Sequence, residues 1–194
     1  RLPLEQRWSI AEGLLSHGED AIDHNLPLMY WYGFEPLVAA DPERALNLAQ
    51  DCGIPLVKRY AIRRAASDDR LLNDVIAALG SSADVDSQHL IAEEVLNAFK
   101  GRVGIAMPPA WEATYEKLTA SDNKSLRERA DEIAVALGDR RIFPRMRKLL
   151  TDRSADPKLK QRALDILVRG RDDQAAPALQ AAVSDPLLRA KAIR

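Results

Sequence analysis

The chain has little of several residue types that other architectures require. A single cysteine, Cys52, among 194 residues excludes an intrachain disulfide framework. Aromatic residues make up 5% of the chain, and the 9 valines, 11 isoleucines and 3 threonines are too few for a sheet-rich fold. No apolar run approaches the roughly 20 residues that cross a bilayer, so we expect no membrane span. Neither a Cys-x-x-Cys-His haem motif nor a Gly-rich phosphate loop occurs, so we expect no cofactor in this chain.

Helix-favouring residues are abundant instead. The chain contains 30 alanines and 26 leucines, which lose little side-chain freedom in a helix. Apolar residues recur at steps of three and four, for example in Leu72–Leu79 and Ile91–Phe99, which places them on one helical face. This spacing predicts an all-α fold of about twelve amphipathic helices joined by short polar breaks. The apolar run Leu26–Val38 predicts a helix that is buried on most sides, with Gly33 allowing close helix approach.

The breaks between the segments carry signals for helix starts and ends. Asp41-Pro42, Asp156-Pro157 and Asp185-Pro186 each predict a capping carboxylate followed by proline at the first helical position. Five glycines fall where helices should end, and we expect them to adopt the left-handed conformation there: Gly53, Gly80, Gly101, Gly138 and Gly170.

The C-terminal third contains an internal repeat. The shift along the chain that aligns Arg129 with Arg162 also aligns Asp139 with Asp172, together with several apolar positions between them. A third copy begins at Asp185. One unit is a helical hairpin of about 30 residues, which cannot bury its apolar face alone. We therefore expect the hairpins to stack into an α-α superhelix.

The segment Asp156–Leu167, with the pattern Asp-Pro-x-Leu-Lys-x-Arg-Ala-Leu-x-x-Leu, resembles HEAT-like repeats, including the short type named after phycobilisome lyases. The resemblance covers residues 121–194 and implies an armadillo-type solenoid of about six hairpins. We expect one repeat domain over residues 1–194, less regular in 1–103 and clearer in 109–194. A non-repeating helical bundle stays an alternative for the N-terminal half.

Candidate metal ligands gather in the segment His17–Asn25. His17, Asp20, Asp23 and His24 carry the nitrogen and oxygen donors that divalent metals take, and Glu19 lies among them. Their spacing matches no established metal motif. The alternative is structural, with Asp23 or Asn25 capping the helix that follows.

The run from His17 to Val38, with the run Ile54–Arg64, resembles the helical-repeat portion of large bacterial multidomain proteins of the membrane-bound dehydrogenase type. In that family a β-propeller precedes the repeats and a c-type haem-binding domain often follows. The resemblance implies that this chain is a segment of such a protein, outside the cytoplasm, with any redox chemistry in other domains. It therefore implies no catalytic residue here.

Charge is distributed unevenly along the chain. Residues 1–120 carry 11 basic and 18 acidic side chains, whereas residues 121–194 carry 17 basic and 11 acidic. The basic end predicts attraction of an acidic partner. Six basic residues are the candidates for partner binding: Arg129, Arg141, Arg145, Lys148, Arg162 and Lys191. The alternative is a solvated face or an Asp–Arg ladder between repeat turns.

The sequence as a whole favours a non-catalytic scaffold that binds a protein partner or neighbouring domains of the same polypeptide. A ligand- or metal-binding domain built on His17–Asn25 is the first alternative. A nucleic-acid-binding HEAT-like protein is the second, and the acidic first half with a net charge of −1 disfavours it.

Overall fold

The computed structural model describes residues 2–102, 104–152, 154–186 and 188–192, and within these ranges it contains helices and no strand. None of the described helices is both long and apolar enough to cross a bilayer. The all-α prediction is confirmed. The helices are α1 (Leu4–Leu15), η1 (Gly18–Ile22), α2 (Leu26–Ala40), α3 (Pro42–Asp51), α4 (Pro55–Ala66), α5 (Leu72–Ser81), α6 (Val85–Phe99), α7 (Trp111–Ala120), α8 (Lys124–Ala136), η2 (Arg140–Ile142), α9 (Phe143–Thr151), α10 (Pro157–Arg169), α11 (Ala176–Val183) and α12 (Arg189–Ala192).

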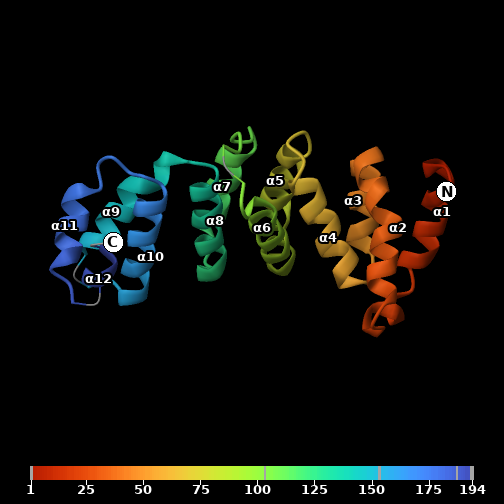
Figure 1. Ribbon diagram of the computed structural model, residues 1–194, viewed down its shortest axis with the longest axis horizontal. Coiled ribbons are helices and arrows are strands. Elements are labelled where there is room, and N and C mark those ends of the chain that lie inside the picture. The colour runs from red at the N-terminus through yellow and green to blue at the C-terminus, as the bar shows by residue number, and fades with distance from the viewer. Residues whose placement is uncertain (1, 103, 153, 187, 193–194) are drawn as a thin grey trace. The chain divides into compact units, whose positions relative to one another are not determined.

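The chain forms two compact units, residues 1–129 and 130–194, which divide within α8. In the first unit α2 packs against α1, α3 and α4, and α4 packs in turn against α6. Figure 1 shows α2, α4 and α6 following one another in this order. The helix α5 packs against both α6 and α7. Helices therefore contact their second neighbour in the chain as well as the first.

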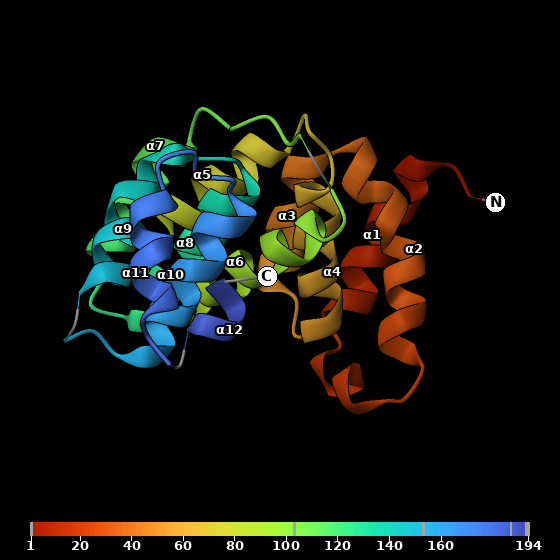
Figure 2. The same cartoon turned by 60° about the vertical axis from the view of Figure 1, so that its left-hand side comes forward.

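The second unit is built around α9. This helix packs against α10 and α11, and α11 packs against the short α12. Figure 2 shows α9, α10 and α11 side by side. The connection between α6 and α7 carries no helix in its described residues, as the sequence predicts for the Gly104–Pro109 linker.

The predicted apolar stripes form the core. Leu72, Val75, Ile76 and Leu79 of α5 are at most 3% exposed. The prediction for α2 is wrong in one respect, because this helix is buried on one side only. Its exposed side carries Leu28, Met29 and Tyr32, and no atom lies within 4 Å of the position that a Cβ on Gly33 would take. The apolar run in the sequence therefore includes residues on the exposed side of α2 as well as on its buried side.

Two of the three predicted aspartate caps are confirmed. Asp41 accepts a hydrogen bond from the Arg44 N–H at 3.1 Å and Asp156 accepts one from the Lys158 N–H at 2.7 Å. Each cap satisfies an N–H that has no partner inside the helix, and proline follows each aspartate at the first helical position. At the third site Pro186 lies in a turn, and the described part of α12 begins later, at Arg189.

The ends of α8 and α10 form the same turn at equivalent positions of the repeat. The N–H groups of Asp139 and Asp172 each donate to the carbonyl five residues back, over 2.8 Å and 3.1 Å. This hydrogen bond belongs to a Schellman turn, in which the preceding residue is left-handed. In the first copy that residue is Gly138, with φ 68°, and in the second it is Arg171, with φ 50°.

The prediction that glycine takes this conformation is right for Gly101 and Gly138 and wrong for Gly53, Gly80 and Gly170. Gly170 precedes the left-handed residue, and a Cβ there would lie 2.6 Å from the Phe143 ring. Gly80 lies inside α5, where a Cβ would lie 2.4 Å from the hydroxyl oxygen of Thr114 on α7. At these two positions close packing accounts for the glycine.

The two Schellman turns make opposite mutational predictions. Arg171→Gly should raise the free energy of unfolding by about 0.5–1 kcal/mol, because it relieves a left-handed conformation that disfavours side chains. Gly138→Ala should lower it by about 1 kcal/mol for the same reason. Urea unfolding of the two variants beside the parent chain measures both values. A destabilised Arg171→Gly protein would contradict this account of the repeat.

Candidate functional site

The segment proposed as a metal site is held together by local hydrogen bonds. His17 Nδ1 lies 2.8 Å from Glu19 Oε1, and this carboxylate raises the pKa of His17 above its ordinary value of 6.5. The Tyr30 hydroxyl on α2 donates to Asp20 Oδ2 at 2.6 Å, and this hydrogen bond raises the pKa of Tyr30. His24 is exposed to solvent.

Of the two predicted caps for α2, the structure uses Asp23. Its Oδ1 accepts hydrogen bonds from the N–H groups of Asn25, at 2.7 Å, and Leu26, at 2.9 Å. These bonds lower the pKa of Asp23, because they stabilise the charged carboxylate. In the described part of the chain, no three His, Cys, Asp or Glu side chains form a group that could hold a metal ion. Asp23 thus serves the turn that starts α2 and Asp20 bonds to Tyr30 on α2, whereas Glu19 pairs with His17.

The basic candidates of the second unit have acidic neighbours. Arg141 Nη2 lies 2.8 Å from Asp139 Oδ2, within the turn that begins η2. Arg145 on α9 forms an ion pair with Asp131 on α8, and Arg162 Nη2 on α10 lies 3.1 Å from Glu132 Oε1 on α8. Lys148 on α9 is exposed. The side chain of Lys191 lies outside the described residues.

A second arginine–aspartate pair occurs at the position equivalent to Asp139. Asp172 accepts a hydrogen bond from Arg147 Nη1 at 3.0 Å, and its side chain is 2% exposed, like that of Asp139. The two aspartates also accept hydrogen bonds from backbone N–H groups two residues ahead. Both aspartates therefore stabilise a repeat turn, as the structural alternative predicted for an Asp–Arg ladder.

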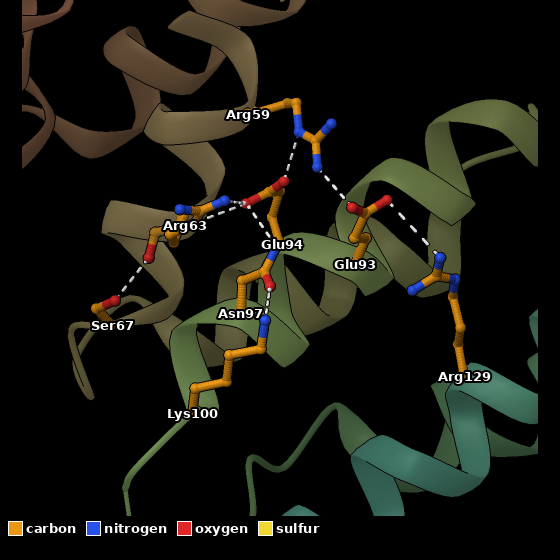
Figure 3. Close-up of polar contacts among 8 residues, drawn as sticks. All are labelled: Arg59, Arg63, Ser67, Glu93, Glu94, Asn97, Lys100 and Arg129. Carbon is orange, nitrogen blue, oxygen red and sulfur yellow. Dashed lines mark hydrogen bonds and ion pairs between the residues drawn. The ribbon is translucent and has the colours of Figure 1, made fainter. Parts of the chain in front are cut away.

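The densest group of charges lies elsewhere, between α4 and α6 of the first unit (Figure 3). Glu94 is 0% exposed, and two arginines of α4 share its carboxylate. Arg59 Nε donates to Oε1 at 2.7 Å, and Arg63 Nε donates to Oε2 at 2.7 Å. Because burying an unpaired carboxylate costs several kcal/mol, these bonds are what makes its burial possible.

The neighbouring Glu93 extends the group. Its Oε1 lies 2.6 Å from Arg59 Nη2, and its Oε2 lies 3.7 Å from Arg129 Nη2 on α8. Figure 3 shows the Glu93 carboxylate between these two guanidinium groups. The hydrogen bond to Glu94 and the charges of both glutamates raise the pKa of Arg59. We call Arg59, Arg63, Glu93, Glu94 and Arg129 the arginine–glutamate cluster.

Of the residues in this cluster, only Arg129 was predicted from the sequence. The sequence contains one signal for a buried ion pair, because Glu94 interrupts the apolar stripe that Ile91, Val95 and Ala98 form at steps of three and four. A carboxylate inside a buried stripe requires partners, and the basic residues of α4 supply them. Which basic residues do so depends on the contact between α4 and α6, which spacing along the chain does not reveal.

A small hollow adjoins the cluster on the first unit. It measures about 200 Å³ and is lined by Trp31 of α2, by Tyr60, Arg63 and Arg64 of α4, and by Ser67. The Trp31 and Tyr60 rings meet edge to face, with centroids 5.5 Å apart. The Arg63 guanidinium lies 5.1 Å from the centre of the Tyr60 ring, a cation–π distance. We call this the Trp31–Arg64 hollow.

Two other hollows lie in the first unit. A groove of about 490 Å³ is lined by residues of α3 to α6, with an apolar floor that includes Ile62, Val75 and Ile91. A hollow of about 280 Å³ lies between α1 and α2 beside the exposed side chains of Leu2, Ile10 and Met29. Few charged side chains line these two hollows, whereas Arg63 and Arg64 both line the Trp31–Arg64 hollow.

Comparison with family models gives no match, and comparisons with curated proteins and with solved structures give none.

The arginine–glutamate cluster predicts unequal roles for its two glutamates. Glu94→Gln should lower the free energy of unfolding by about 2–3 kcal/mol, because it removes the buried partner of two arginines. Glu93→Gln, the matched control one residue away, should cost less than about 1 kcal/mol, because its ion pairs are partly exposed. Thermal and urea unfolding followed by circular dichroism measures both. Equal losses for the two variants would refute the central position of Glu94.

Proposed function

We propose that this chain is a HEAT-like α-solenoid module that acts as a non-catalytic scaffold for protein partners or for neighbouring domains of its own polypeptide. The observation that carries the proposal is that alternate helices pack against one another, as α2 and α4, α4 and α6, and α9 and α11 do. Stacked hairpins require each helix to contact the second helix along the chain, whereas a globular bundle has no such rule.

Ion pairs as well as packing support this linkage in the first unit. Glu35 of α2 lies 3.7 Å from Arg64 of α4, and α4 is joined to α6 through Glu94. Glu93 of α6 then reaches Arg129 of α8. In this unit α2, α4, α6 and the start of α8 thus form one series, each tied to the next by opposite charges.

The second unit supports the same rule separately. Arg162 of α10 pairs with Glu132 of α8, and its repeat equivalent Arg129 pairs with Glu93 on α6. In both copies an arginine on an even-numbered helix reaches back to a glutamate on the preceding even-numbered helix. A recurring contact at a recurring sequence position is what a stacked repeat predicts.

The surface formed by α2, α4 and α6 of the first unit, with Arg129 beside it, is the proposed docking surface. It exposes charged groups on rigid elements, since Arg59, Arg63, Arg64 and Arg129 are each between 31% and 38% exposed while held by carboxylates. Preorganised arginines lose little freedom on binding, which favours their use at interfaces. The resemblance described above adds the context of a larger, redox-linked bacterial protein.

Selection of binding peptides from a displayed random library tests the proposal, followed by NMR mapping of the selected peptides on the full chain. The proposal predicts amide shift changes concentrated in α4 and α6, and none with the same peptides in scrambled order. Changes confined to residues 17–25 would favour the ligand-binding alternative instead. Failure to select any peptide that passes the scrambled control would contradict an interaction module.

A further inference from the structure

The Trp31–Arg64 hollow has the size of a site for one side chain. Its volume of about 200 Å³ is below the roughly 300 Å³ at which sites for cofactors and drug-sized ligands begin. One wall is aromatic and rigid, because Trp31 is 8% exposed and packs edge to face on Tyr60. Two guanidinium groups, those of Arg63 and Arg64, also line the hollow and are suited to a planar anion such as a carboxylate.

The two arginines differ in how they are held. Arg63 is fixed by Glu94, to which both Nε and Nη2 lie at 2.7 Å, and by the Tyr60 ring. Arg64 has a looser contact, since its Nε lies 3.7 Å from Glu35 Oε1 and both side chains are more than a third exposed. An exposed ion pair of this length contributes little, so an incoming carboxylate can replace Glu35.

The arginine–glutamate cluster and the hollow beside it together carry more cations than carboxylates, although the first 120 residues are acidic overall. Five cations lie in and around the arginine–glutamate cluster, against four carboxylates, for a net charge of +1: Arg59, Arg63, Arg64, Lys100 and Arg129 against Glu35, Asp68, Glu93 and Glu94. A local excess of this sign attracts anionic segments and speeds their association.

We infer that this surface binds an acidic peptide segment of a protein partner, with one carboxylate side chain in the Trp31–Arg64 hollow between Arg63 and Arg64. The inference rests on the proposed function and adds the chemical class of the partner. Arg59 and Arg63 lie one helical turn apart, about 6 Å along α4. Alternate side chains of an extended peptide are about 7 Å apart, so neighbouring acidic side chains on one face of the peptide match this spacing.

A peptide fits the site better than a nucleic acid does. A base binds by stacking on an open aromatic face, whereas Trp31 is almost fully buried with its ring packed against Tyr60 at an interplanar angle of 80°. The hollow also has room for one carboxylate side chain rather than for a nucleotide.

Fluorescence anisotropy with a labelled octaglutamate peptide and the full chain tests the inference. Arg64→Glu should weaken binding about tenfold, because it replaces attraction by repulsion. Glu35→Gln should strengthen binding about twofold to fivefold, because it removes the competing carboxylate. Lys158→Glu, which changes a basic residue to the same acid at an exposed position of α10, should leave the affinity within about twofold of the parent, because it lies outside the site.

Tighter binding by Glu35→Gln cannot be explained by misfolding, since a damaged protein would not bind the peptide more tightly. Equal weakening by Arg64→Glu and Lys158→Glu would show that the peptide is held by general charge attraction, and would overturn the inference. Tighter, Arg64-dependent binding of an eight-nucleotide oligothymidylate would overturn it in favour of nucleic acid. If octaglutamate does not bind while library peptides still shift α4 and α6, the acidic class is wrong and the interaction module stands.

Discussion

The buried carboxylate of Glu94 fixes how α6 meets α4, and the candidate binding surface depends on that contact. A fully buried glutamate is stable only where donors surround it, so Arg59 and Arg63 must face α6. This sets the rotation of α4 about its axis. Tyr60 and Arg64 then fall beside Trp31 of α2, where they line a hollow. The ion pairs of Glu94 thus determine which side chains of α4 are exposed beside α2.

Much of the fold follows from local patterns in the sequence. The buried stripe of α5 and the caps at Asp41 and Asp156 depend on residues within a turn or two of one another, and both were predictable. The predictions are wrong where a residue is determined by contacts with side chains far away in the sequence. Gly170 is explained by the Phe143 ring, and the left-handed residue beside it is Arg171, which carries no conformational signal of its own.

The candidate site was harder to predict than the fold. The segment His17–Asn25 was a candidate metal site because two histidines and three carboxylates lie close together in it, yet Asp23 serves as a helix cap and Asp20 accepts from Tyr30. The arginine–glutamate cluster joins α4 to α6 across the intervening α5, far beyond the reach of local spacing. These residues come together only because α4, α6 and α8 pack in the fold. Arg129 was found from the repeat alone, because it aligns with Arg162, and the structure pairs these two arginines with Glu93 and Glu132.

The proposed solenoid predicts an elongated molecule, and small-angle X-ray scattering of the purified protein tests this prediction most directly. A compact globule of 194 residues has a radius of gyration of about 16 Å. About six hairpins stacked about 10 Å apart give about 20 Å, with an asymmetric distance distribution. The larger radius is the expected result, and the smaller radius with a symmetric distribution would contradict the solenoid.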